Sequence, residues 1–162
     1  MVVVGVDVGF GFTKATDGES SVLFKSLTGE PQPRSMEENF FPGEGISGSH
    51  LTLDERSFFV GELAESESRV RQFTLDHSQM VAQQFRILAL ASIARIAPSR
   101  VPINVVTGLP VVHFIQFRNH LAEALTGDHS IVLHEEGKEK EVLLSIRDRP
   151  GQGQDRRYRR RF

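Results

Sequence analysis

The feature that most constrains this fold is a mostly β-branched apolar run, Val2–Val8, which the sequence Gly9-Phe10-Gly11 interrupts at once. A continuous run of this kind is typical of a β-strand that is buried on both faces. The alternating segment Phe12–Thr16 follows directly, so the glycines predict a tight hairpin turn between two strands. After a second turn at Asp17-Gly18, residues 21–27 alternate again. We therefore expect an antiparallel three-stranded meander at the start of the chain.

The remaining chain alternates between helix and strand patterns. The expected elements are, in order, a loop-rich segment at 28–50, a short hairpin at 51–60, a helix at 79–96, a strand at 101–107, a helix from Pro110 to Gly127 and a hairpin within 130–146. The first helix has one apolar stripe, which leaves Gln84 and Arg95 outside it. This order predicts an α/β fold whose mixed sheet has an antiparallel start, parallel crossovers and flanking helices.

The end of the chain differs from the rest in charge. Residues 1–146 carry 12 Lys and Arg against 19 Asp and Glu, a net charge of −7, whereas residues 147–162 carry seven Arg against two Asp, a net charge of +5. This last segment has no apolar period, so it predicts neither helix nor strand. We expect one domain at 1–146, with an irregular insertion at 28–76, and a disordered arginine-rich tail at 147–162.

The composition excludes several kinds of site. The chain has no cysteine, which excludes disulfides, thiolate metal sites and cysteine nucleophiles. Its six histidines lack the spacing of a helical metal site, and the adjacent acidic pairs Glu37-Glu38 and Glu135-Glu136 are typical of solvated residues. No apolar run approaches the roughly 20 residues that span a bilayer. We expect a cytoplasmic protein without membrane contact.

Residues 7–14 hold the chemistry of a phosphate site. Asp7 lies at the end of a predicted strand, Gly9 and Gly11 allow backbone N–H groups to come close to an anion, and Lys14 adds a cation. A carboxylate in this place can hold hydrated Mg²⁺, which usually keeps several waters and takes one or two carboxylates. Taken alone, the same residues also fit an ordinary hairpin. Neither a P-loop nor a complete dinucleotide fingerprint is present.

Residues 3–14 read Val-Val-Gly-Val-Asp-Val-Gly-Phe-Gly-Phe-Thr-Lys, which resembles the first phosphate loop of the actin-like ATPases, above all of the ParM/StbA plasmid-segregation and archaeal actin-like proteins. Residues 59–64 resemble the family's segment before its first long helix, and residues 105–111 its next strand-to-helix turn. The likeness covers residues 2–146. It implies a ribonuclease-H-like domain that binds ATP or GTP with Mg²⁺ between two similar halves, hydrolyses the nucleotide and forms filaments.

The resemblance also assigns roles by position. It implies a metal-associated carboxylate at Asp7 and places Gly108, preceded by Thr107, near the nucleotide cleft. The implied cofactor-binding turn and its flank comprise Gly9, Phe10, Gly11, Phe12, Thr13 and Lys14. The backbone N–H groups of Phe10 and Phe12 would serve the phosphate, and we expect one of the two rings to pack under the sheet.

This chain corresponds to the N-terminal half of that family alone. The family's water-positioning Glu or Gln, second phosphate loop and nucleoside-binding residues have no counterpart here, so we assign no catalytic residue. We expect weak nucleotide binding and little hydrolysis, because phosphoryl transfer needs positioned water, metal and charge stabilisation together. The alternative is a truncated, non-catalytic domain that self-associates without nucleotide. A sugar- or acetate-kinase-like relative would share the turn, but no acceptor-substrate motif is visible.

Partners follow from composition and from the resemblance. We expect self-association, as a filament or homo-oligomer, because missing elements leave apolar surface exposed. A DNA-bound adaptor is implied only through the full-length family. The tail carries Tyr158 and Phe162 among its arginines, as a nucleic-acid-binding arm does, but we favour a tail without that role. Phe40-Phe41 fits a partner-facing patch in the insertion.

Overall fold

The computed structural model describes residues 1–31, 48–68, 71–72, 78–108, 111–135 and 138–147. The arginine-rich tail from residue 148 on, Phe40-Phe41 and Glu37-Glu38 lie outside the described residues. Within these ranges, no helix has both the length and the apolar character that a membrane span requires.

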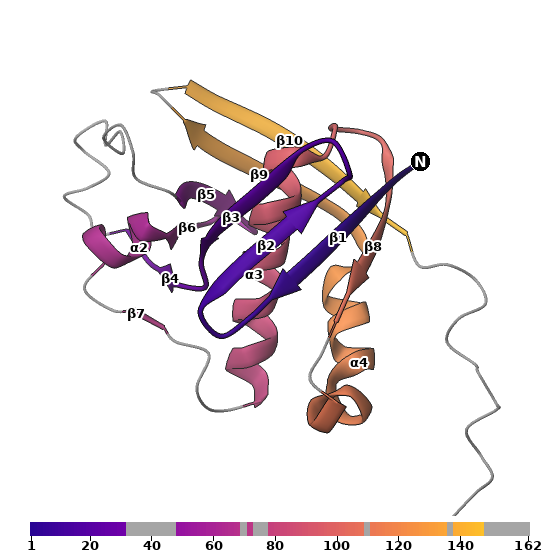
Figure 1. The fold of residues 1–162 in the computed structure, drawn as a ribbon. Helices are drawn as coiled ribbons and strands as arrows, with labels where there is room; N and C mark the ends of the chain where they lie inside the picture. Colours follow the sequence, from indigo (N-terminus) through magenta and orange to yellow (C-terminus); the bar gives the residue numbers. More distant parts are fainter. Residues whose placement is uncertain (32–47, 69–70, 73–77, 109–110, 136–137, 148–162) are drawn as a thin grey trace, which may run out of the picture.

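A single mixed sheet and three helices make up the described fold (Figure 1). The strands are β1 Val2–Val8, β2 Phe12–Thr16, β3 Ser21–Lys25, β4 Thr28–Gly29, β5 Gly48–Leu53, β6 Arg56–Gly61, β7 Arg71–Gln72, β8 Pro102–Thr107, β9 Gly127–Glu135 and β10 Lys138–Ile146, and the helices are α2 Glu62–Glu67, α3 Ser78–Ile96 and α4 Val111–Leu125. The strand order is β3-β2-β1-β8-β10-β9-β5-β6-β4-β7. The predicted meander is confirmed, since β1 pairs antiparallel with β2 and β2 with β3, while β8 is parallel to β1 and β10.

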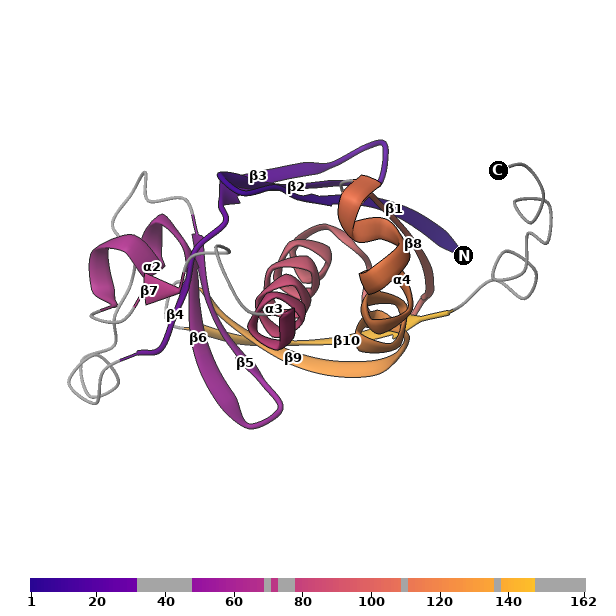
Figure 2. The same cartoon turned by 90° about the horizontal axis from the view of Figure 1, so that it is seen from below.

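Helix α3 lies in the middle of the domain. Figure 2 shows it between the β1–β3 layer and the β9–β10 layer, with β5 and β6 at one side. Every residue in 87–94 is buried, and Gln84 is only 3% exposed. The prediction of one apolar stripe with Gln84 outside it is therefore wrong. The sheet curves around the helix and covers more than one of its faces. The apolar pattern of the helix alone does not show how many of its faces are covered.

The described part of residues 28–76 extends this sheet with regular elements. The predicted hairpin is confirmed as β5 and β6, with Leu53 paired to Arg56 across the two-residue turn Asp54-Glu55. Both turn residues have positive φ, 50° and 62°, as in a type I′ turn. Strand β5 joins the rest of the sheet through four residue pairs with β9. The one-and-a-half-turn helix α2, which follows β6, was not predicted from the sequence.

The part of the sheet formed by β3, β2, β1 and β8 has one covered face and one open face. Val4 and Val6 are buried toward α3, whereas Val3 and Asp7, which alternate with them on β1, are exposed. The prediction that this strand is buried on both faces is therefore wrong, because none of the described elements covers the second face. We call this surface the open face. Its exposed apolar side chains are Val3 (50% exposed), Phe12 (47%), Leu23 (55%) and Val106 (62%).

Candidate functional site

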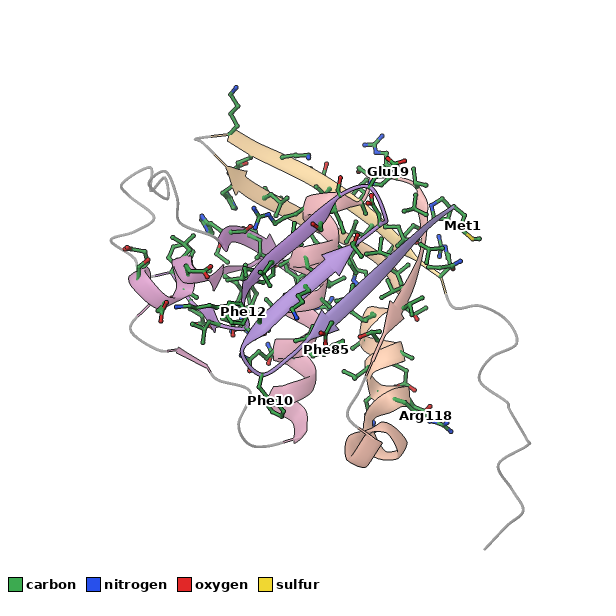
Figure 3. All side chains as sticks on the ribbon, viewed as in Figure 1. Met1, Phe10, Phe12, Glu19, Phe85 and Arg118 are labelled. Carbon is green, nitrogen blue, oxygen red and sulfur yellow. The ribbon has the colours of Figure 1, made fainter. Side chains whose placement is uncertain are left out.

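The carboxyl ends of β1 and β8 meet at one edge of the sheet. The two strands are parallel, and Val6 is paired with Thr107, so the β1–β2 turn and Gly108 follow their strands at the same edge. In Figure 3, Phe10 marks this turn, at the far end of the meander from Met1 and Glu19. The fold thus brings the predicted turn and the predicted Gly108 to one place. Carboxyl ends of parallel strands are where open α/β sheets bind ligands.

Asp7 and Lys14 lie next to each other on neighbouring strands. They are directly paired in the β1–β2 ladder, and both are exposed on the open face. Among the described residues, neither side chain forms a hydrogen bond or an ion pair within 4.0 Å. An acidic and a basic group therefore stand free beside each other at the start of the turn. A ligand that carries both an anion and a cation can satisfy both.

Gly9 closes the turn with its own backbone. Its N–H donates to the carbonyl of Phe12 at 3.0 Å, and a Cβ atom at Gly9 would come within 3.1 Å of that oxygen. A side chain at Gly9 would thus crowd this oxygen, and the N–H of Gly9 is already used inside the turn. The N–H groups of Phe10 and Gly11 have no acceptor among the described residues. These two are the donors that the turn leaves for an anion.

Ser26 fixes the turn from the core side. Its N–H donates to the carbonyl of Gly11 at 2.9 Å, and its hydroxyl lies 3.0 Å from the hydroxyl of Thr13. Both hydroxyls are buried. The Thr13 side chain therefore points into the core and supports the turn. Sequence reasoning missed Ser26, although its place beyond Phe24 in an alternating strand predicts a buried hydroxyl that needs a partner.

The two phenylalanines of the turn are exposed. Phe10 is 69% exposed and Phe12 is 47% exposed, so the prediction that one ring packs under the sheet is wrong. Phe12 lies on the same side of β2 as Lys14, because the two are two positions apart along the strand, and Phe10 lies in the turn itself. Figure 3 shows both rings at the end of the meander where the turn lies.

The donor set at this edge fits hydrated magnesium. Asp7 offers one exposed carboxylate, and the described residues contain no group of three or more His, Cys, Asp or Glu that could surround a metal ion. Mg²⁺ keeps most of its waters and needs only one or two protein carboxylates. An open site with a single carboxylate therefore fits Mg²⁺ and does not fit a metal that demands a closed shell of protein ligands.

Comparison with known families agrees with this arrangement. The sequence matches the family described as "Actin like proteins N terminal domain" over residues 5–147. The chain belongs to the actin-like proteins. The family predicted from the turn motif is confirmed, and no curated protein matches the chain.

Solved structures of actin-like proteins share the fold. The psk41 ParM protein gives a TM-score of 0.67 at 18% identity, over 90% of this chain and 48% of that one. A ParM filament from Clostridium botulinum gives a TM-score of 0.68 at 21% sequence identity, and the match covers 93% of this chain and 48% of that one. The archaeal actin homolog Ta0583 gives a TM-score of 0.66 at 23% identity, with 92% of this chain and 46% of that one covered. This actin-like chain thus spans about half the length of these relatives.

Proposed function

We propose that this chain provides one wall of an actin-like nucleotide site and binds the phosphates of Mg²⁺-ATP or Mg²⁺-GTP at its β1–β2 turn. The proposal rests on the end of the β1–β2 hairpin. There, among the described residues, the side chains of Asp7 and Lys14 and the N–H groups of Phe10 and Gly11 have no partner. Gly108 ends the neighbouring strand at that edge and leaves open space, since a Cβ there would have no heavy atom within 4 Å. Ta0583 has been solved in complex with ADP, which supports a nucleotide as the ligand class.

Each group has a distinct role in this proposal. The Lys14 ammonium attracts the phosphate oxygens, and the N–H groups of Phe10 and Gly11 donate to them. The Asp7 carboxylate would repel a bare phosphate, so it contributes when it holds a hydrated magnesium ion. That ion, when bound, neutralises part of the phosphate charge. Gly9 and Ser26 keep the turn in the shape that points the two donors outward.

One wall of a site binds more weakly than two. Each 1.4 kcal/mol of lost contact lowers affinity about tenfold, so we propose weak binding by a chain that spans about half the length of its relatives. We propose little or no hydrolysis by this chain alone, because phosphoryl transfer depends on water, metal and charge stabilisation acting together. We propose filament formation, and binding to any DNA-bound adaptor, only for actin-like proteins of the relatives' length.

The open face favours a second function, self-association without nucleotide. Val3, Leu23 and Val106 leave about half or more of their surface exposed on one side of the sheet. Apolar side chains exposed on one face of a sheet can mark an interaction surface. Relatives described as filaments include ParM from Clostridium botulinum and Alp12. In this second proposal the chain has the actin-like fold but binds no nucleotide, and two or more copies of the chain associate through the open face.

Binding of a fluorescent ATP analogue, with and without Mg²⁺, tests the first proposal. We expect the Kd to rise about tenfold or more in Lys14→Gln, because this variant loses one charged contact with the phosphates. Lys138→Gln is the matched control, because Lys138 is an exposed lysine on β10. Equal affinity in the two variants, or no binding at millimolar Mg²⁺-nucleotide, contradicts the proposal. Saturable binding that survives removal of Mg²⁺ contradicts the role of Asp7.

A further inference from the structure

The ladder that joins the β5–β6 hairpin to the body of the sheet includes two stacked histidines. Strand β5 pairs with β9 through residues 50–53 and 131–134, and His50 is the direct partner of His134. Their ring centroids lie 4.1 Å apart, with 19° between the ring planes. In the strand order, β6, β4 and β7 all lie beyond this ladder. The histidine pair therefore lies at the junction between this outer part of the sheet and the rest.

The two rings have different surroundings within one row of side chains that crosses four strands. His134 Nε2 lies 2.9 Å from the Thr52 hydroxyl, and His134 Nδ1 lies 3.5 Å from a carboxylate oxygen of Glu139 on β10. His50 instead meets the Phe59 ring edge-on, at 5.0 Å between centroids. Its Nε2 is buried and has no hydrogen-bond partner among the described residues. Both ring nitrogens of His134 thus have an oxygen nearby, whereas the described part of the chain offers none to Nε2 of His50.

Few charged groups reach the pair. The described charged and titratable residues on the elements packed around it are Arg56 on β6, Glu62, Glu65 and Glu67 on α2, Arg86 and Arg95 on α3, Asp128 and His129 on β9, and Lys138, Glu139, Lys140 and Glu141 on β10. Four of them are ion-paired elsewhere: Arg56 with Glu30, Glu65 with Lys25, Arg86 with Asp54, and Asp128 with Arg147. On β10, Lys138 and Lys140 alternate with Glu139 and so project to the other face. Among the described residues, only Glu139 comes within ion-pair distance of a ring.

We propose that the His50–His134 pair is a pH-dependent joint, which holds the β5–β6 hairpin on β9 at neutral pH and releases it when both rings take up protons. Each ring nitrogen of His134 faces an oxygen, of the Thr52 hydroxyl or of the Glu139 carboxylate. Protons on both rings would place two cations in stacked rings 4.1 Å apart, and the Nε2–H of His50 would be buried without an acceptor among the described residues. The rings must separate before both are charged.

The direction of the pH dependence follows from proton binding. Burial, together with the charge of His134, lowers the pKa of His50 from 6.5 to about 4 while the ladder is closed. The open state therefore binds protons more tightly, and closure is favoured fully above about pH 6.5 and lost progressively as the pH falls toward 4. Because the pair is only half-buried, we expect a smaller effect than the full shift implies, about a tenfold rise in the opening constant between pH 7.5 and pH 5.

Hydrogen exchange of the β5 amides at pH 7.5 and pH 5, corrected for intrinsic exchange rates, measures this opening. The amides of Leu51 and Leu53 point to β6 within the hairpin, whereas alternation along the ladder directs those of His50 and Thr52 to β9. We expect protection of the Thr52 amide to fall about tenfold in the unmodified chain. His50→Phe keeps an aromatic ring but cannot take up a proton, so it should abolish the pH dependence. His120→Gln, at an exposed position of α4, is the matched control and should retain it. Equal loss of protection in the His50→Phe variant and the unmodified chain overturns the proposal.

A second measurement covers the case in which His50→Phe does not fold. In an NMR titration of the unmodified chain, the His50 ring should keep its neutral chemical shift at pH 5.5, which lies between its lowered pKa of about 4 and the ordinary histidine value of 6.5. A His50 ring that is protonated at pH 5.5 in the folded domain overturns the proposal. Neither experiment needs nucleotide, so the outcome is independent of the proposed function.

Discussion

Asp7 and Lys14 are direct cross-strand partners on the open face of the sheet, and yet their charges do not pair. Opposite charges placed opposite each other in an antiparallel ladder usually attract and stabilise the sheet. Here both stay free at the strand end where the turn leaves two N–H donors without acceptors. The pairing thus positions two charges for a ligand that carries a phosphate and a metal ion together.

Removing the Ser26 hydroxyl should loosen the turn. Ser26→Ala leaves the buried Thr13 hydroxyl without its partner, so we expect the free energy of unfolding to fall by about 1–2 kcal/mol. Nucleotide affinity should fall as well, because the turn loses part of its support. Urea unfolding checks the first effect, with the exposed Ser21→Ala as the control. Unchanged stability in Ser26→Ala would count against the support role.

Gly48 should not tolerate a side chain. Its φ is +149°, and a Cβ atom would lie 2.3 Å from the carbonyl oxygen of Val60 and 3.0 Å from the backbone nitrogen of Leu63. We expect Gly48→Ala to lower the free energy of unfolding by about 2–4 kcal/mol. At Gly11, a Cβ atom meets nothing within 4 Å. Thermal melts should therefore show a large loss for Gly48→Ala and little for Gly11→Ala, and similar melts would contradict the packing described at β5 and β6.

The β5–β6 turn should gain stability from glycine. Glu55 has a φ of 62°, which costs energy for any residue with a Cβ atom. Glycine is the preferred second residue of a type I′ turn, so Glu55→Gly should raise the free energy of unfolding by about 0.5–1 kcal/mol. Asp54 is a poorer place for the same change, because its carboxylate bonds to Arg86 at 2.6 Å. Chemical denaturation of both glycine variants checks this, and a loss at Glu55 would contradict the turn geometry.

Arg86 links α3 to three neighbouring elements. It bonds to Asp54 in the β5–β6 turn, to the carbonyl of Ala124 on α4 and, at 3.4 Å, to His129 on β9. This contact lowers the pKa of Asp54, so the carboxylate stabilises the fold above the unfolded value of 3.8 and loses that contribution as the pH falls through its lowered pKa. Because Asp54 is largely exposed, the effect should stay below about 1 kcal/mol. Arg86→Met should flatten stability between pH 5 and pH 3, and an unchanged slope would contradict this.

The open face should drive any self-association of this chain. Val106→Lys with Leu23→Lys adds charge to that face without touching the core, and we expect the association constant to fall about tenfold or more. Sedimentation velocity across a concentration series measures it. The paired control Lys138→Glu with Lys140→Glu alters charge on β10 instead. Equal effects of the two double variants would place the contact elsewhere.

Local sequence signals predicted the elements that carry strong local patterns. The bounds of β1 and β2 follow from a β-branched run, a glycine turn and strict alternation, all of which act over a few residues. Helix α2 was missed because it is short, its N-cap residue Gly61 has no side chain to cap it, and it buries only Leu63 and Ala64. The open face and the all-round burial of α3 depend on how distant strands are placed, which no local pattern records.

The site was predictable in its residue types and not in its hydrogen bonds. Asp7, Lys14 and the two glycines are visible in the sequence as a phosphate-type turn. Which N–H groups stay free depends on the turn's own bonding, since Gly9 donates to Phe12. The support from Ser26 also comes from a strand end 13 residues from Thr13, so it appears only once the meander has formed.

The most direct test of the central claim is the melting temperature of this chain with and without Mg²⁺-ATP or Mg²⁺-GTP, beside the Asp7→Asn variant. A ligand that binds only the folded state at about ten times its Kd stabilises by about 1.4 kcal/mol, which is about 3–6 °C for a chain of this size. We expect such a rise for at least one nucleotide, dependent on Mg²⁺ and lost in Asp7→Asn. No rise at millimolar nucleotide, or an equal rise in the variant, would contradict it.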